Sequence, residues 1–146
     1  MVVFICIFSD DGRLLIQQRD LKKSWGGYWD VSAAGAVISG EDSTDAAMRE
    51  TKEELGLDLK RDRLYKAMSL YYDKHIHDIF IYNAGPGELP KVPDGLRLQQ
   101  GEVAGAKWAD KAEVCSMLEN REFIPVYKEF IELLFAMHKS KGIMLT

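Results

Sequence analysis

The sequence has few cysteines and no long apolar run. Its two cysteines, Cys6 and Cys115, lie far apart and do not have the spacing of a metal site. We expect both to be small buried apolar residues in a reducing cytoplasm. No apolar run approaches the roughly 20 residues of a membrane span, and no basic segment precedes a long apolar stretch at the N-terminus. We therefore expect neither membrane association nor a signal peptide.

The sequence also lacks an excess of positive charge. Its 19 Lys and Arg against 23 Asp and Glu give a net charge of −4. This balance argues against a broad surface for nucleic acid or membrane, although a local basic pocket remains compatible with it. Apolar residues make up 47% and charged residues 29%, as in ordinary soluble proteins. Without repeats, low-complexity tracts or a linker, residues 1–146 are expected to form one domain.

The most informative stretch is residues 35–57. Its centre predicts a short helix, because Asp42 or Ser43 can cap the first turn and Gly56 supplies a left-handed stop. The stripe that should face the core repeats every fourth residue: Ala47, Thr51 and Leu55.

Three carboxylates, Glu50, Glu53 and Glu54, share one face of this helix. Like charges one turn apart destabilise a helix by roughly 0.2–0.5 kcal/mol per pair. One explanation is a solvated acidic face, relieved by Arg49 and Lys52. The other is a hard divalent cation, because Mg²⁺ prefers carboxylate oxygens, water and substrate phosphate.

Two observations favour the cation. Ala46 precedes Glu50 by one turn, so no bulky side chain blocks the acidic face. Gly35 and Gly40 precede the helix, where a backbone carbonyl could approach an ion closely. The sequence therefore predicts a metal site between this loop and the helix.

The same stretch resembles the signature of the Nudix hydrolases, in which a Gly, a Glu and an Arg-Glu pair precede a Glu-Glu pair and a second Gly. The matching residues are Gly35, Glu41, Arg49, Glu50, Glu53, Glu54, Gly56 and Leu57. Thr51 replaces the usual aliphatic residue, and its methyl group can still pack. By ordinary residue frequencies, such a match arises by chance at a given start about once in a hundred million or less. The resemblance implies an α/β/α sandwich with a mixed β-sheet between helices.

The resemblance further implies a Mg²⁺-dependent pyrophosphohydrolase, with Mn²⁺ as an alternative metal. Its substrate would be a nucleoside diphosphate linked to another group, or a similar small organic diphosphate. The implied metal ligands are Glu50, Glu53, Glu54 and the Gly35 carbonyl. Glu50 is a general base rather than a ligand in some members of the family. We expect Arg49 to orient Glu50 or Glu41. Glu41 should either bond to helix N–H groups and fix the loop, or touch a second metal.

Residues 19–28 form a basic loop that contains Trp25. It is either a solvated surface loop or the place where Arg19, Lys22 or Lys23 meets substrate phosphate. We expect Arg19, Lys23 and Trp25 to bind substrate, with Trp25 as a wall of the pocket or as scaffold. Glu102 either begins a strand in solvent or, as in several members of the family, helps to hold metal or water.

Four aromatic or imidazole residues lie around a predicted turn. His75 and His77 are two residues apart, which is a weak metal signal, and we expect a surface or structural role for both. Tyr71 and Tyr72 are expected to be core and edge aromatics rather than a base-stacking pair.

The remaining pattern predicts strands, turns and two more helices. The expected strands are residues 2–8, 13–18, 29–34, 36–38, 64–72, 77–83 and 102–109, with turns at 9–12 and 73–76 and a loop at 85–95. The expected helices are residues 111–118, capped by Asp110, and 124–138. Members of the family usually have a few more residues before the first strand, which fits a trimmed or unusually short N-terminus.

Within the family, residues 22–41 resemble the branch related to isopentenyl diphosphate isomerase. That enzyme has a Cys just before the signature Gly and a metal-binding His just after it. Here these positions are Ala34 and Ala36, which disfavours proton transfer across a double bond and favours hydrolysis. A non-catalytic nucleotide-binding module is a third interpretation, disfavoured because every signature carboxylate is present. Homodimers are common in the family, but nothing in the sequence specifies a symmetric interface.

Overall fold

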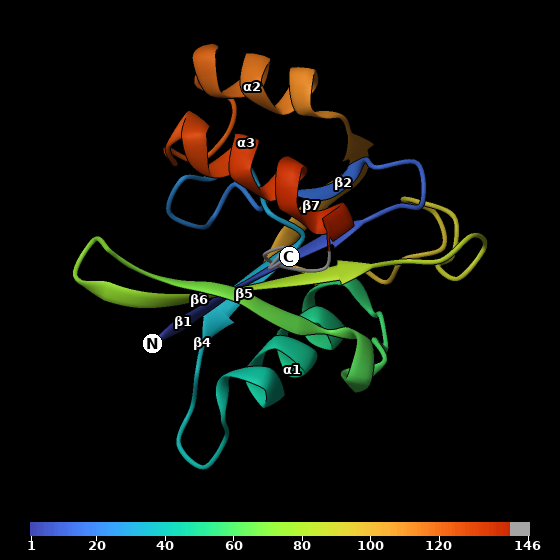
Figure 1. Ribbon diagram of the computed structural model, residues 1–146. Coiled ribbons are helices and arrows are strands. Elements are labelled where there is room, and N and C mark those ends of the chain that lie inside the picture. The colour runs from blue at the N-terminus through green and yellow to red at the C-terminus, as the bar shows by residue number, and fades with distance from the viewer. Residues whose placement is uncertain (141–146) are drawn as a thin grey trace.

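The fold is a sheet layered between helices, with α1 on one face and α2 and α3 on the other (Figure 1). The computed structural model describes residues 1–140, so the last six residues of the expected domain lie outside the described part. Within residues 1–140, seven strands form one sheet that contains both parallel and antiparallel pairs. The predicted α/β/α sandwich with a mixed sheet is confirmed. None of the helices in this part of the chain is long and apolar enough to span a membrane.

The strands and helices follow one another as the hydrophobic pattern predicts. The strands are β1 (Val2–Phe8), β2 (Leu14–Arg19), β3 (Trp29–Asp30), β4 (Ala33–Ala36), β5 (Tyr65–Tyr72), β6 (His75–Asn83) and β7 (Val103–Ala109). The helices are α1 (Ser43–Leu55), α2 (Lys111–Glu119) and α3 (Lys128–Met137), with short 3₁₀ turns η1 (Arg61–Arg63) and η2 (His138–Ser140).

The sheet divides along one edge of β1. On its other edge, β1 pairs in parallel with β6 along its whole length. On the dividing edge it pairs with β2 only at Phe8 and Leu14, and farther along it pairs antiparallel with β4 instead. The Ser32 hydroxyl bridges the two arms, because it accepts from the Ile7 N–H at 2.9 Å and donates to the Leu15 carbonyl. The split brings Gly35, in β4, to the edge of the sheet next to α1.

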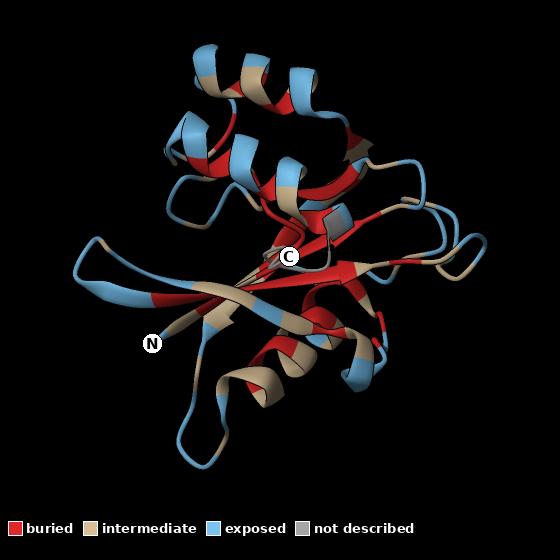
Figure 2. Ribbon diagram, in the orientation of Figure 1, coloured by how far each residue is buried: buried red, intermediate tan, exposed pale blue. Residues whose placement is uncertain are grey.

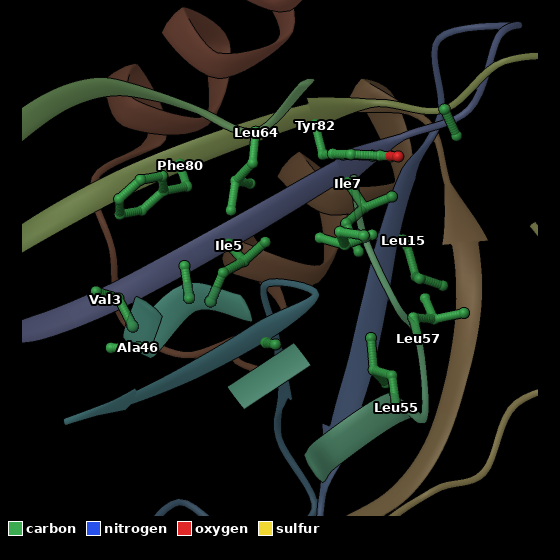
Figure 3. Close-up of a cluster of buried hydrophobic side chains, with 14 of the residues drawn as sticks. Val3, Ile5, Ile7, Leu15, Ala46, Leu55, Leu57, Leu64, Phe80 and Tyr82 are labelled. Carbon is green, nitrogen blue, oxygen red and sulfur yellow. The ribbon is translucent and has the colours of Figure 1, made fainter. Parts of the chain in front are cut away.

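Alternating side chains of β1 build two cores, one on each face. Val3, Ile5 and Ile7 lie in the cluster packed against α1, and Cys6 and Phe8 lie in the cluster beneath α2 and α3. Figure 3 shows the α1 cluster, and Figure 2 shows that the buried face of each helix turns toward the sheet. The predicted core stripe of α1 is confirmed, since Ala47, Thr51 and Leu55 are fully buried. The prediction that both cysteines are buried holds for Cys6, whereas Cys115 is half-buried.

Several predicted boundaries are wrong. The helix expected from residue 124 begins at Lys128, because the Ile124 N–H donates to the Trp29 carbonyl at 2.9 Å. The strand expected over 29–34 is interrupted after Asp30, and only Ala36 of the segment 36–38 belongs to a strand. The turn expected over 73–76 is shorter, since β6 already begins at His75.

Candidate active site

Helix α1 is held in one register by caps at both ends. The Asp42 side chain accepts from the Asp45 N–H at 2.7 Å, and the Asp45 side chain accepts from the Asp42 N–H at 3.1 Å. At the other end, Gly56 has φ 72° and donates to the Lys52 carbonyl at 3.0 Å. Of the two candidate N-caps, Asp42 is therefore the residue used.

The signature glycine of β4 lies directly against α1. A Cβ at Gly35 would overlap the carboxylate of Glu50, well inside van der Waals distance. Its φ is not in the left-handed region, so the requirement for glycine here is space and not backbone conformation. Because Gly35 has no side chain, the Glu50 carboxylate packs directly against its backbone.

Glu54 is buried beside the same strand. Its side chain accepts from the Ala34 N–H at 2.9 Å and from Gln17 Nε2 at 3.3 Å, and Glu54 is only 4% exposed. Burial raises the pKa of Glu54 to about 7, and it also raises the pKa of Glu50. Burial therefore disfavours the ionised form of both neighbouring carboxylates.

Arg49 ties the acidic residues to one another and to β4. Its Nη1 donates to Glu50 at 2.8 Å and to Glu53 at 3.3 Å. Its Nη2 donates to Glu41 at 2.8 Å and to the Ala36 carbonyl at 2.9 Å. Arg49 therefore contacts both carboxylates that it was expected to orient, and its hydrogen bonds lower the pKa of Glu41.

Glu41 fixes the loop before α1. Besides Arg49, it accepts from the Ile38 N–H at 3.0 Å. Of its two interpretations, the one in which Glu41 fixes the loop through helix N–H groups has the wrong partner, because Asp42 and Asp45 cap the first turn and Glu41 bonds to the loop instead. Contact with a second metal stays a prediction.

The acidic residues offer the ligand atoms that a divalent metal prefers, but their side chains are not arranged around a common point. Among the residues that the structure describes, no three His, Cys, Asp or Glu side chains converge on a ready metal site. The reason is local, since Arg49 engages Glu50 and Glu53 while Glu54 turns toward the Ala34 N–H. The carboxylate oxygens are nevertheless the ligand atoms that Mg²⁺ prefers. Burial disfavours the negative charge of Glu50 and Glu54, and a bound cation would stabilise that charge.

A cleft of about 350 Å³ opens beside β4. Its walls bring together all three predicted substrate-binding residues, Arg19, Lys23 and Trp25, with residues 34–36 of the signature strand. We call this hollow the basic cleft. Lys23 is also close enough to Glu50 and Glu54 to influence their charge.

The two cations of the basic cleft have partners that sequence reasoning missed. Arg19 Nη1 contacts buried Asp30 at 3.0 Å, and Arg19 Nε donates to the Ser24 carbonyl at 2.9 Å. Lys23 forms an ion pair with Glu102. Glu102 lies just before β7 with a side chain that is 41% exposed, and its role in holding metal or water stays a prediction.

Trp25 and the two histidines also have defined surroundings. Trp25 is 52% exposed and contacts the ring of Tyr28 edge-on, with centroids 5.1 Å apart. His75 is exposed, whereas His77 is buried between the rings of Phe4 and Tyr72. Lys22, by contrast, is an exposed residue that does not line the basic cleft.

The chain is similar to known proteins over most of its length. A family model described as "NUDIX domain" matches residues 1–134. The "Uncharacterized Nudix hydrolase lmo0368" of Listeria monocytogenes is 36% identical over 136 residues, covering 92% of this chain and 76% of that protein. The isopentenyl-diphosphate Delta-isomerase of Shigella flexneri is 29% identical over 109 residues, covering 74% of this chain and 60% of the isomerase.

The fold also matches solved structures. The crystal structure of DR0079 from Deinococcus radiodurans superimposes with a TM-score of 0.69, covering 90% of this chain and 80% of that one. The two sequences are 22% identical, so this likeness concerns the fold alone.

Proposed function

The chain belongs to the Nudix hydrolase family, and from that membership we propose that it hydrolyses a diphosphate bond with Mg²⁺ as its cofactor, or Mn²⁺ in its place. The proposed substrate is a small molecule: a nucleoside diphosphate linked to another group, or a similar organic diphosphate. One observation carries the proposal. The Glu50 carboxylate packs against Gly35, Glu54 accepts from the neighbouring Ala34 N–H, and both Ala34 and Gly35 line the basic cleft.

Each residue at this edge has a proposed task. Glu50, Glu53 and Glu54 hold the cation together with the Gly35 carbonyl. A bound divalent cation would neutralise phosphate oxygens and lower the pKa of a coordinated water. Glu50 is also the proposed base, as its counterpart is in some members of the family, because a carboxylate oxygen that is not bound to metal can accept a proton from water.

The surrounding residues position these groups and the substrate. Arg49 holds the carboxylates in place through the contacts described above, and Glu41 anchors Arg49 to the loop. Lys23 and Arg19 offer positive charge to the substrate phosphates, and Trp25 forms a wall of the basic cleft.

Two other functions are weighed against hydrolysis. Isomerisation of isopentenyl diphosphate needs a group that can move a proton, and the methyl side chains of Ala34 and Ala36 cannot do so. Incubation with isopentenyl diphosphate should therefore yield no dimethylallyl isomer. A purely binding role is disfavoured because all signature carboxylates are present, and Mg²⁺-stimulated turnover of any diphosphate would exclude it.

The test is phosphate release from a panel of diphosphates by the wild type and by Glu53→Gln and Glu54→Gln. Each substitution should lower Mg²⁺-dependent turnover at least about 100-fold, the order of loss when one group that stabilises transition-state charge is removed. The unfolding midpoint should change little, since Gln is isosteric with Glu and retains an acceptor oxygen for the Ala34 N–H. Glu129→Gln, on the exposed face of α3, is the matched control and should retain full activity. Near-normal turnover in the two α1 variants would refute the assignment.

A further inference from the structure

Strand β2 carries a buried polar side chain beside the candidate active site. Gln17 is 3% exposed and follows three fully buried apolar residues, Leu14, Leu15 and Ile16. An amide in an apolar core is unfavourable unless new partners replace its hydrogen bonds to water. The partners of Gln17 therefore indicate what an amide does at this position.

The amide group of Gln17 is held in one orientation. Its Nε2 lies 3.1 Å from the Ser32 carbonyl oxygen and 3.3 Å from Oε1 of Glu54. A carbonyl oxygen can only accept, so the amide nitrogen and not the amide oxygen must face Ser32. The nitrogen carries two hydrogens, and the second is donated to Glu54. Gln17 thereby joins β2 both to the residue before β4 and to α1.

Two hydrogen bonds meet on one oxygen of the Glu54 carboxylate. Oε1 accepts from the Ala34 N–H at 2.9 Å and from Gln17 Nε2. The two donors lie on different arms of the divided sheet, because β2 pairs with β1, β3 and β7, whereas β4 pairs with β1. A carboxylate whose one oxygen is held from two strands has little freedom to rotate. The direction of its other oxygen, Oε2, is then fixed as well.

We infer that Gln17 is a positioning residue for Glu54: Gln17 and the Ala34 N–H hold Oε1, and Oε2 binds the divalent cation. This inference rests on the proposed function, because it takes Glu54 as a metal ligand. Residues that hydrogen-bond to a metal ligand fix its orientation, and their loss typically weakens metal binding about 10- to 100-fold. Gln17 lies outside the signature of residues 35–57, so the signature does not assign it this role.

The test is Mn²⁺ binding without substrate, measured from the signal of free Mn²⁺ in electron paramagnetic resonance. Gln17→Met keeps the approximate length of the side chain and removes its hydrogen-bond donors, so the Kd for Mn²⁺ should rise about 10- to 100-fold. Gln18→Met is the matched control. Gln18 is the next residue of β2, and its Nε2 donates to the Gly27 carbonyl at 3.0 Å instead of to a carboxylate of α1. This variant should keep the wild-type Kd.

Thermal unfolding of the same variants separates positioning from a purely structural role. If Gln17 served only to bond with the Ser32 carbonyl, Gln17→Met would lower the unfolding midpoint while the folded variant kept the wild-type Kd. That result would overturn the inference. A rise in the Kd at temperatures where the variant is fully folded supports it.

A second measurement needs no variant. In the wild type, the side-chain amide resonances of Gln17 should shift as Mg²⁺ is added, because the carboxylate that accepts from this amide binds the ion. They should shift more than those of Gln18. Gln17 resonances that stay in place while Mg²⁺ binds would overturn the inference even if Gln17→Met failed to fold. Failure of the proposed function is distinguishable, since the wild type itself would then bind neither Mn²⁺ nor Mg²⁺.

Discussion

At the scale of single residues, the site depends on one missing side chain. Gly35→Ala would place a methyl group where the Glu50 carboxylate lies. We expect a loss of about 1–3 kcal/mol in the free energy of unfolding, the usual cost of overpacking. Because Glu50 must then move, hydrolysis should be lost even under conditions where the variant is folded. Urea unfolding and phosphate release measure the two effects.

Gly105→Ala is the matched control. Gly105 lies in β7 with a φ outside the left-handed region, and an added Cβ would meet its nearest neighbours at 3.6–3.9 Å, which is ordinary contact. It should retain activity and change the free energy of unfolding by less than about 0.5 kcal/mol. Equal effects of the two substitutions would contradict the proposed contact between Gly35 and Glu50.

The residues of the site differ in how far the sequence alone could predict them. The glutamates and Arg49 were predictable because their spacing along one helix fixes their relative places. The partners of Arg19 and Lys23 were not, because Asp30 and Glu102 reach them through pairings between β2, β3 and the start of β7. Gln17 also escaped prediction, since a polar residue within an apolar strand gives no sign of the Glu54 carboxylate it will meet.

At the scale of elements, the position of α1 depends on its N-cap. Asp42→Ala removes the side chain that accepts from the Asp45 N–H, so the free energy of unfolding should fall by about 1 kcal/mol, within 0.5–2. Chemical denaturation measures the loss. Asp58→Ala removes an exposed carboxylate paired with Lys52, and should cost no more than a few tenths of a kcal/mol. If both cost the same, the cap does not stabilise α1.

Elements with strong local signals were predicted well, and elements made by tertiary pairing were not. Helix α1 carries its own start and stop signals, so its ends agree with the sequence. The start of α3 does not, because apolar residues continue with helical spacing through Ile124 and Val126 while the backbone of Ile124 pairs with β3. Hydrophobic periodicity predicts which side chains are buried. It does not predict whether the backbone N–H groups of those residues bond within a helix or to a neighbouring strand.

At the scale of the whole molecule, η2 is fastened to the sheet by one histidine. The His138 ring stacks on Phe8 with centroids 3.9 Å apart, and its Nδ1 lies 3.1 Å from Asn83 Oδ1. Burial, with the nearby charge of Lys139, lowers the pKa of His138 to about 4. The neutral imidazole is therefore the form that the fold accommodates.

This pKa predicts how stability depends on pH. The unfolded histidine has a pKa near 6.5, so between about pH 6.5 and 4 the unfolded chain binds a proton that the folded chain does not. The free energy of unfolding should therefore fall as the pH is lowered through this window, and below it the contribution of His138 should no longer change with pH. Urea unfolding at several pH values should show a steeper fall for the wild type than for His138→Phe, which keeps an aromatic ring but cannot titrate. Parallel curves would contradict this role, since the other titrating groups are common to both proteins.

The central claim is that the glutamates of α1 hold a divalent cation at the edge of the sheet. Diffraction from crystals soaked in Mn²⁺, with data collected for anomalous scattering, tests it most directly. We expect an anomalous peak within direct coordination distance of carboxylate oxygens of Glu50, Glu53 and Glu54, with Arg49 withdrawn from at least one of them. Soaked crystals with no peak at this edge, and with Glu50 and Glu53 still paired with Arg49, would contradict the account.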